Sequence, residues 1–171
     1  MNMIKQDKVT IYTDGAAKGN PGRAGWGAVI IFHNDKLKVE SEKLKVVEIG
    51  GNAEHATNNQ MELTAPIQSL KYLKSNMSKR HFDIEIVSDS KYVILGITEW
   101  IFNWQKNNWR NAANKPVVNR ELWEELYELT QELKPKWTYV KGHNEDKYND
   151  RADLIATSFA EGEPVGLKNK H

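Results

Sequence analysis

Two stretches of this chain end in an aspartate directly after a strand-like pattern, and this repetition constrains the fold most. Residues 9–13 alternate in the manner of a strand and run into Asp14, and residues 84–88 do the same before Asp89. Such alternation is typical of a strand with one face on a core. In an open α/β sheet, ligands usually bind in the crevice beyond the carboxyl ends of adjacent strands. Two aspartates at two such ends therefore predict the beginning of a metal site.

The order of the other patterns predicts an α/β protein. Residues 26–32 indicate a buried strand, residues 36–49 a charged return strand or pair of strands that Gly50 and Gly51 end, and residues 137–140 a short strand. Helical spacing of apolar residues covers the remaining segments, 57–73, 90–104, 122–133 and 152–159. Because strands come first and βαβ crossovers follow, we expect a mixed sheet with helices on both faces.

The helix predicted after residue 57 carries two local signals. Thr57 is followed three residues later by Gln60, the pattern of a capping box at a helix start. Pro66 lies inside the same helix and removes one backbone hydrogen bond, so we expect a kink near Glu62.

Length, charge and cysteine content narrow the class of protein. The 171 residues suit one domain, with a core from about residue 8 to residue 160 and a frayed C-terminal tail. Without cysteine there is no disulfide framework and no thiolate metal site, which suits a cytoplasmic protein. No signal-peptide or membrane-spanning pattern occurs. With a net charge of only +1, binding to a polyanion has to come from local arrangement.

Four carboxylates are candidates for one metal site. Asp14 and Asp89 end the two strands, Glu62 lies about one turn into a helix, and Asp153 falls in the first turn of the last helix. Phosphodiester hydrolysis needs charge stabilised on the attacking and the leaving oxygen, which two divalent ions provide. Small, hard Mg²⁺ prefers oxygen ligands. Asp153 has an alternative explanation, because carboxylates near helix starts stabilise the helix dipole.

Five short motifs occur in order over residues 8–160. They are Thr13-Asp14-Gly15, Thr57-Asn58-Asn59-Gln60-Met61-Glu62-Leu63, Ser88-Asp89-Ser90, Lys141-Gly142-His143 and Asn149-Asp150-Arg151-Ala152-Asp153. Together they resemble the motifs of type 1 ribonuclease H, the bacterial ribonuclease HI type. The resemblance implies the ribonuclease H-like fold, which is a mixed five-stranded sheet with helices on both faces and a basic protrusion.

The same resemblance implies an activity and its residues. It implies a monomeric endonuclease that cuts the RNA strand of an RNA–DNA hybrid and leaves a 5′-phosphate and a 3′-hydroxyl. Asp14, Glu62, Asp89 and Asp153 would hold two Mg²⁺ ions, with Mn²⁺ as a substitute. His143 would be a mobile-loop histidine that helps the product leave or handles a proton; the alternative is a solvated loop histidine.

Further positions match substrate contacts of the family. By the resemblance, the RNA strand is contacted by Gly15, Asn20, Asn58 and Asn59. Thr57 would grip a DNA phosphate, and Asn119 would join it. Alternatives remain for three of these residues: Asn20 suits a turn, and Thr57 and Asn119 suit helix N-caps.

A cluster of aromatic and basic residues resembles the protrusion that lies along the DNA strand. Its members are Trp100, Trp104, Lys106, Trp109, Arg110 and Lys115. Aromatics interleaved with cations suit a sugar-phosphate track. The intervening residues are mostly neutral, so we expect only weak electrostatic attraction between this protrusion and the DNA strand. Trp100 and Trp104, four residues apart, could equally belong to the core.

Three other functions remain open from the sequence alone. The first is a catalytically inactive hybrid-binding module, which would be expected to lack a carboxylate ligand. The second is another polynucleotidyl transferase of the same fold, and the third is the nuclease domain of a reverse transcriptase. The stretch from Phe32 to Thr57 is longer than in the compact bacterial form, and no role follows for it.

Overall fold

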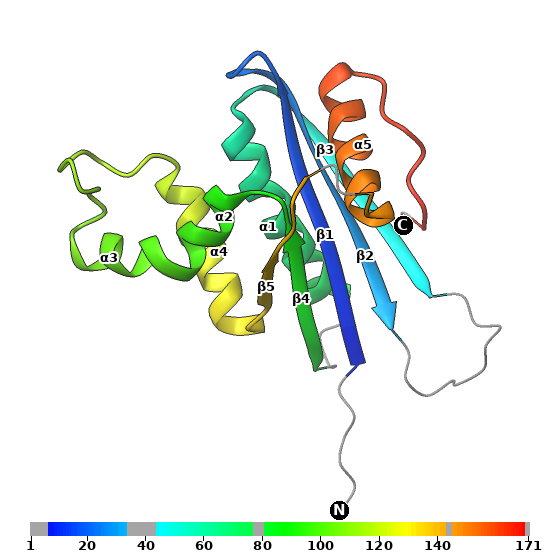
Figure 1. Ribbon diagram of the computed structural model, residues 1–171, viewed down its shortest axis with the longest axis horizontal. Coiled ribbons are helices and arrows are strands. Elements are labelled where there is room, and N and C mark those ends of the chain that lie inside the picture. The colour runs from blue at the N-terminus through cyan, green and yellow to red at the C-terminus, as the bar shows by residue number, and fades with distance from the viewer. Residues whose placement is uncertain (1–6, 34–43, 77–80, 143–144, 170–171) are drawn as a thin grey trace, which may run out of the picture.

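The fold is built on one mixed sheet of five strands (Figure 1). The computed structural model describes residues 7–33, 44–76, 81–142 and 145–169. The strands are β1 (Asp7–Lys18), β2 (Gly22–His33), β3 (Lys45–Ala56), β4 (Phe82–Ser88) and β5 (Lys136–Tyr139). Their order across the sheet is β3-β2-β1-β4-β5. β2 is antiparallel to both β1 and β3, whereas β4 is parallel to both β1 and β5. The predicted mixed, five-stranded sheet is confirmed.

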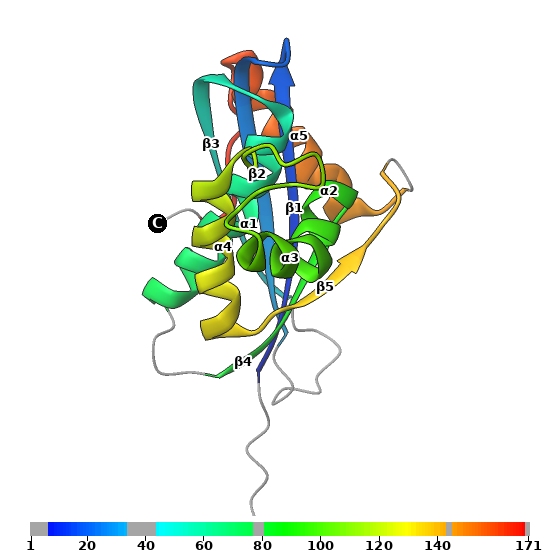
Figure 2. The ribbon, with the colours of Figure 1, turned by 90° about the vertical axis from the view of Figure 1, so that its left-hand side faces the viewer.

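Helices cover both faces of this sheet. α1 (Asn58–Asn76) lies on one face with α4 (Arg120–Leu133) against it, and α5 (Lys147–Glu161) lies on the other face (Figures 1 and 2). The alternation of the strands explains this. Ile11 and Ile30 pack with the α1 side, whereas Val29 and Ile31 pack with Ile155 of α5. Within the described residues, no helix has the length and apolar character needed to cross a membrane.

Glycines bring α5 unusually close to the sheet. A Cβ on Gly25 would lie 2.3 Å from the carbonyl oxygen of Ala156, and a Cβ on Gly27 would lie 2.8 Å from that of Ala152. Gly50 lies under α5 as well. The expected strand end at Gly50 and Gly51 is therefore wrong: β3 continues through both, because the missing side chains serve packing rather than a turn.

The predicted helical run after β4 is divided into three parts. α2 (Lys91–Leu95) is followed by the π-helix η1 (Gly96–Trp100) and by α3 (Ile101–Lys106). Ser90 caps α2, since its hydroxyl accepts a hydrogen bond from the backbone of Val93 at 3.2 Å. A Cβ on Gly96 would lie 2.1 Å from the Trp123 ring, so the π-helix begins where the backbone packs on that indole. This long-range contact leaves no trace in the local helical spacing.

The chain after Glu161 is held against the sheet rather than frayed. The backbone N–H of Glu48 on β3 donates to the carbonyl of Lys168 at 2.9 Å, and Val165 and Leu167 pack on the α5 side of the sheet. Burial alone would raise the pKa of Glu48, but hydrogen bonds from Arg151 and from the Lys168 backbone hold that pKa below its usual value. The expected frayed tail therefore differs from what the structure shows up to Asn169.

Pro66→Ala tests how α1 tolerates its internal proline. Pro66 is buried, and α1 continues through it. The alanine would restore an N–H that can donate to the Glu62 carbonyl, while a few buried methylene groups are lost. These effects oppose each other, so we expect the free energy of unfolding to change by less than about 1 kcal/mol. Urea unfolding measures this, and a loss of several kcal/mol would show that the proline is built into the core packing.

Candidate active site

The ends of β1 and β4 bring two carboxylates together. Thr13 pairs with Ser88 in the parallel register, so Asp14 and Asp89 follow at neighbouring positions. Carboxylate oxygens of Asp14, Glu62 and Asp89 all lie within 4.8 Å of one another. The predicted meeting of the two strand-ending aspartates is thus seen in the structure, and Glu62 joins them from α1.

Two local features place Glu62 at this point. The backbone N–H of Thr57 donates to Gln60 Oε1 at 2.8 Å, and the N–H of Gln60 donates to Thr57 Oγ1 at 3.1 Å, which confirms the predicted capping box. A Cβ on Gly15 would lie 2.5 Å from the Glu62 backbone nitrogen. The bare backbone at Gly15 therefore lets the start of α1 lie directly against the end of β1.

Asp153 reaches the cluster from the opposite side of the sheet. It lies on α5 and contacts the carboxyl group of Asp14, but it is outside the set of three carboxylates that lie within 4.8 Å of one another. The helix is capped by Asp146, whose carboxylate accepts hydrogen bonds from Tyr148 and Asn149. Asp153 falls in the second turn of α5 rather than the predicted first turn. Asp146 therefore serves the helix start, and stabilisation of the helix dipole no longer explains Asp153.

The electrostatics of the cluster favour bound protons or a bound cation. Burial, together with the neighbouring Asp89 and Asp153, raises the pKa of Asp14 to about 8. Burial and the charges of Asp14 and Asp89 raise the pKa of Glu62 well above its usual value. The Oε2 atom of Glu62 is buried without a hydrogen-bond partner among the described residues. An all-oxygen donor set with an unpaired buried oxygen fits a hard divalent cation.

Comparisons with known proteins agree with this geometry. The RNase H family model matches residues 6–161. A ribonuclease H of Thermosynechococcus vestitus is 44% identical over 158 residues, 92% of each chain. A ribonuclease HI of Pseudomonas aeruginosa is 43% identical over 154 residues, 90% of this chain and 94% of its own. The chain belongs to the ribonuclease H family.

Solved structures of this family share the fold. LC9-RNase H1, described as a type 1 RNase H with the type 2 active-site motif, superposes with a TM-score of 0.82 at 22% identity, covering 99% of this chain and 80% of its own. LC11-RNase H1, solved in complex with an RNA/DNA hybrid, gives 0.62 at 23% identity, covering 90% and 97%. The predicted ribonuclease H-like fold is confirmed.

The polar residues predicted to contact the RNA strand of a ribonuclease H substrate gather at the start of α1. The side-chain oxygen of Asn20, in the turn between β1 and β2, accepts a hydrogen bond from the backbone of Asn58 at 3.0 Å. Asn58 and Asn59 are exposed, whereas Gly15 is buried beside Asp14. The Thr57 hydroxyl caps α1. These residues therefore surround the start of α1, the helix that carries Glu62 of the carboxylate cluster. We call this surface the polar rim.

Asn119 does not act as expected of an N-cap. It occupies the residue before α4, but in the left-handed conformation with φ 65°, and its side chain makes no capping hydrogen bond. Instead its amide donates to the Tyr92 hydroxyl at 3.1 Å. The capping explanation is therefore wrong for Asn119, and its predicted phosphate contact stays a prediction.

The predicted protrusion is a cluster of aromatic rings in tilted and edge-to-face contact, with three basic residues. The Trp104 ring lies 6.0 Å from Trp100, 6.1 Å from Trp109 and 5.3 Å from the buried Trp123, centroid to centroid. Trp104 and Trp109 pack against the core, and Trp100 is 37% exposed. The three basic side chains are exposed: Lys106, Arg110 and Lys115. The tryptophans thus build the protrusion, and the cations are its polar surface.

Two predicted features lie outside the described residues. One is His143, and the other is the first part of the return strand, residues 36–43. Beside the site, Lys91 follows Asp89 by two residues, and its Nζ lies 5.5 Å from the centre of the Tyr139 ring.

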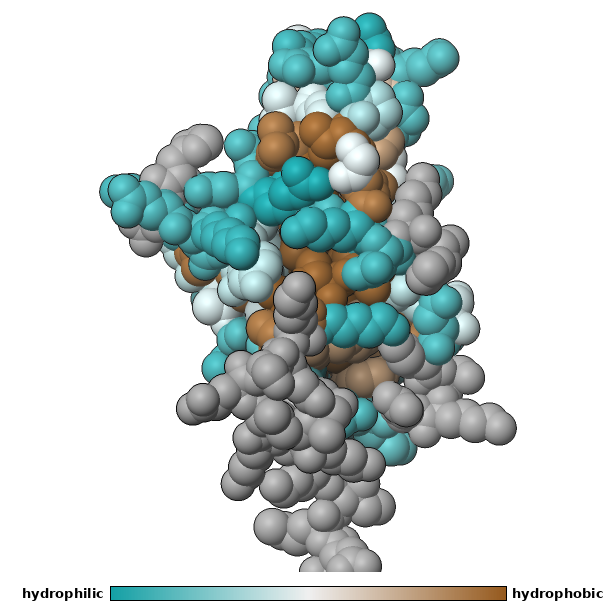
Figure 3. Space-filling view, turned by 90° about the vertical axis from the view of Figure 1, so that its right-hand side faces the viewer, coloured by the Kyte–Doolittle hydropathy of each residue, from teal (hydrophilic) through white to brown (hydrophobic). Residues whose placement is uncertain are grey.

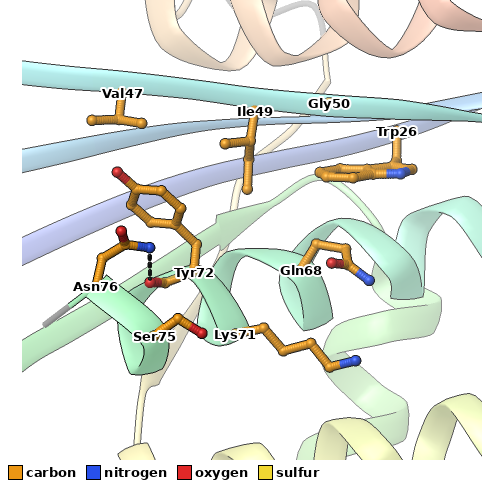
Figure 4. A pocket seen from close by; sticks show the side chains of 9 residues that line it. All are labelled: Trp26, Val47, Ile49, Gly50, Gln68, Lys71, Tyr72, Ser75 and Asn76. Carbon is orange, nitrogen blue, oxygen red and sulfur yellow. Dashed lines mark hydrogen bonds between the residues drawn. The ribbon is translucent and has the colours of Figure 1, made fainter. Parts of the chain in front are cut away.

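The structure also contains a cavity that is separate from the carboxylate cluster. A cavity of about 350 Å³ lies between β3 and α1, with Trp26 and Ile49 on the strand side and Gln68 and Tyr72 on the helix side (Figure 4). Lys71 is the charged residue in its wall, and no carboxylate lines it. The cavity is therefore no part of the candidate metal site.

Proposed function

We propose that this protein is an endonuclease that hydrolyses the RNA strand of RNA–DNA hybrids and leaves 5′-phosphate and 3′-hydroxyl ends. The observation that carries the proposal is the meeting of Asp14, Glu62 and Asp89 within 4.8 Å in a chain of the ribonuclease H family. Relatives named ribonuclease H or HI, about as long as this chain, support it.

The carboxylates have distinct tasks in this proposal. Asp14 is the central ligand, since it lies beside Glu62, Asp89 and Asp153. The four residues hold two Mg²⁺ ions, for which Mn²⁺ can substitute. Such a pair of ions, when bound, stabilises charge on the attacking and the leaving oxygen of the phosphodiester. Bound cations would offset the burial and the mutual repulsion that raise the pKa of Asp14 and of Glu62.

Substrate recognition is assigned to the surface around the cluster. An enzyme that cuts RNA only opposite DNA has to sense the 2′-hydroxyls of one strand. Exposed Asn20, Asn58 and Asn59 next to the carboxylates are suited to this, and LC11-RNase H1 was solved with an RNA/DNA hybrid. Thr57 and Asn119 contact the DNA strand, and His143 assists product release or proton transfer.

The proposal also includes the cellular compartment and the oligomeric state of the protein. The lack of cysteine supports a reducing compartment, the cytoplasm, and the protein acts as a monomer.

The ends of the product test the proposed reaction. A hybrid whose RNA strand is labelled at internal nucleotides along its length is incubated with Mg²⁺ and with Mn²⁺, and the fragments are treated with phosphatase or with a 3′-end-extending polymerase. We expect internal cuts whose upstream fragments can be extended and whose downstream fragments lose a phosphate. Fragments with 3′-phosphates, or removal of single nucleotides from an end, would contradict the proposal.

The sparse charge of the protrusion predicts a modest salt dependence of hybrid binding. Between residues 98 and 119 the only basic residues are Lys106, Arg110 and Lys115. Each neutralised phosphate adds about 0.7 to 0.9 to the slope of log affinity against log salt. Lysines at Asn107, Ala112 and Ala113, which are exposed, should steepen the slope by roughly 2 and lower KM. kcat should hardly change, because uniform binding stabilises ground and transition states alike.

The matched control places three lysines far from the protrusion. Ser75, Asn76 and Gln131 are exposed at the ends of α1 and α4 and give the same change in net charge. KM and kcat are measured on one hybrid at several salt concentrations. If both triple variants change the slope equally, the protrusion does not lie along the DNA strand.

A further inference from the structure

An ion pair between the buried Glu48 and the partly exposed Arg151 joins three segments on the α5 side of the sheet. Arg151 on α5 donates from Nε to Glu48 Oε2 at 2.8 Å and from Nη2 to Glu48 Oε1 at 3.0 Å, and Glu48 on β3 is 1% exposed. Arg151 also donates to the Gly166 carbonyl at 2.9 Å, and the Lys168 backbone donates to Glu48 Oε1 at 2.9 Å. We name these four residues the clamp. Two-pronged arginine–carboxylate contacts fix geometry as well as charge.

The clamp lies on the face of the molecule that α5 and the C-terminal segment cover. Figure 1 shows both on the same side of the sheet, and Figure 3 shows that side with hydrophobic surface interrupted by hydrophilic side chains. The neighbouring contacts of α5 are with backbone at Gly25, Gly27 and Gly50. The glycines allow close approach, and the packing of Ile155 with Val29 and Ile31, together with the contacts of Arg151, sets the rotation of α5 about its axis.

Arg151 and Asp153 point in opposite directions from α5. Successive residues of an α-helix are about 100° apart, so these two side chains are separated by roughly 200° around the axis. Arg151 reaches Glu48 on β3, and Asp153 reaches Asp14 on β1. A rotation of α5 that withdraws Asp153 from Asp14 must therefore also break the contacts of Arg151.

We infer that the clamp is a positioning device that sets the rotation of α5 and so holds Asp153 in the metal cluster. This inference rests on the proposed function, because Asp153 is a ligand only there. Arg151 and Glu48 are positioning residues: they touch neither the substrate nor the ions. The C-terminal segment, through Gly166 and Lys168, becomes part of the support of the active site.

Arg151→Lys keeps the charge but loses the two-pronged contact, and Glu48→Gln keeps the shape but loses the charge. A chain shortened after Gly162 loses the Gly166 and Lys168 contacts of the clamp together with the packing of Val165 and Leu167 on the sheet, and it is the second test if either substitution prevents folding. Leu129→Ala is the control: it removes a buried side chain of α4, which carries none of the four carboxylates. All proteins are compared at a temperature at which each is folded, by kcat and KM on a hybrid and by Mn²⁺ titration of the metal-free form.

We expect Arg151→Lys and Glu48→Gln to weaken Mn²⁺ binding roughly ten-fold. We expect kcat to fall roughly ten-fold as well, with KM for the hybrid nearly unchanged. The double variant should be no worse than either single variant, and the shortened chain should lie between them and the wild type. Wild-type kcat and Mn²⁺ affinity in the folded variants, or an equal loss in Leu129→Ala, would overturn the inference. An inactive wild type that still binds Mn²⁺ would instead contradict the proposed function.

Discussion

Asp14→Asn is expected to abolish hybrid cleavage while leaving hybrid binding largely intact. Asp14 lies between Glu62, Asp89 and Asp153, so the loss of its charge disturbs every ligand of the cluster. The residues assigned to substrate contact, such as Asn58 and Asn59, lie on the rim and are untouched. Turnover with Mg²⁺ and Kd for the hybrid measure the two effects. Substantial Mg²⁺-dependent turnover by this variant would contradict the assignment of Asp14 as the central ligand.

The same substitution should stabilise the metal-free protein at alkaline pH. In the folded protein the pKa of Asp14 is raised from 3.8 to about 8, so between these values the folded state holds a proton that the unfolded chain releases. Rising pH therefore lowers the free energy of unfolding over this range, by up to about 1.4 kcal/mol for each pH unit. Asparagine does not titrate, so rising pH does not lower the free energy of unfolding of the variant through this group.

Denaturation in EDTA at pH 4 and pH 9 measures the difference. At pH 4 the protonated aspartic acid and asparagine should be nearly equal in stability, and at pH 9 the variant should be more stable by several kcal/mol, on the order of 5. With Mg²⁺ present the advantage should shrink, because the ion binds only the folded wild type tightly. If Asp14→Asn and the wild type are equally stable at both pH values, the folded protein does not raise the pKa of Asp14.

Gly15→Ala should inactivate the protein without removing any functional group. The added Cβ would lie 2.5 Å from the Glu62 nitrogen and 2.6 Å from the Met61 carbonyl carbon, both backbone atoms that cannot rotate away. The start of α1 must shift, and Glu62 shifts with it. We expect kcat to fall by roughly a hundred-fold and stability by about 1–3 kcal/mol.

Gly51→Ala is the matched control for this steric effect. Its Cβ would lie 2.7 Å from Trp26 Nε1, a side-chain contact that involves none of the four carboxylates. Its effect on kcat should be much smaller than that of Gly15→Ala. If Gly15→Ala keeps the wild-type kcat, the position of Glu62 does not depend on the close approach of α1 to β1.

Local patterns were sufficient to predict the elements that carry the site. The alternation before Asp14 and Asp89 predicts two strands whose ends meet, and the capping box predicts the start of the helix that carries Glu62. Each of these features depends on neighbouring residues of the chain. Only the resemblance to family motifs assigned Glu62 and Asp153 to the site. No local sequence pattern indicates which helices lie against the same edge of the sheet.

The features that sequence reasoning missed depend on contacts between distant segments. Gly50 suggests a turn locally but serves the approach of α5 to β3. The π-helix begins at Gly96, where the backbone lies against the Trp123 ring. The C-terminal segment looks frayed because its partner, Glu48, lies far away along the chain. In each case the local pattern is present in the sequence, but a contact with a distant segment determines the structure that forms.

Cleavage of three labelled duplexes tests the central claim most directly. Wild-type protein is incubated with RNA–DNA hybrid, double-stranded RNA or double-stranded DNA of the same sequence, each with Mg²⁺ and each with EDTA. The carboxylate cluster and the polar rim predict that only the RNA strand of the hybrid is cut, and only with the metal ion. Cutting of double-stranded RNA or DNA at a similar rate, cutting in EDTA, or no cutting of the hybrid with either Mg²⁺ or Mn²⁺ would contradict it.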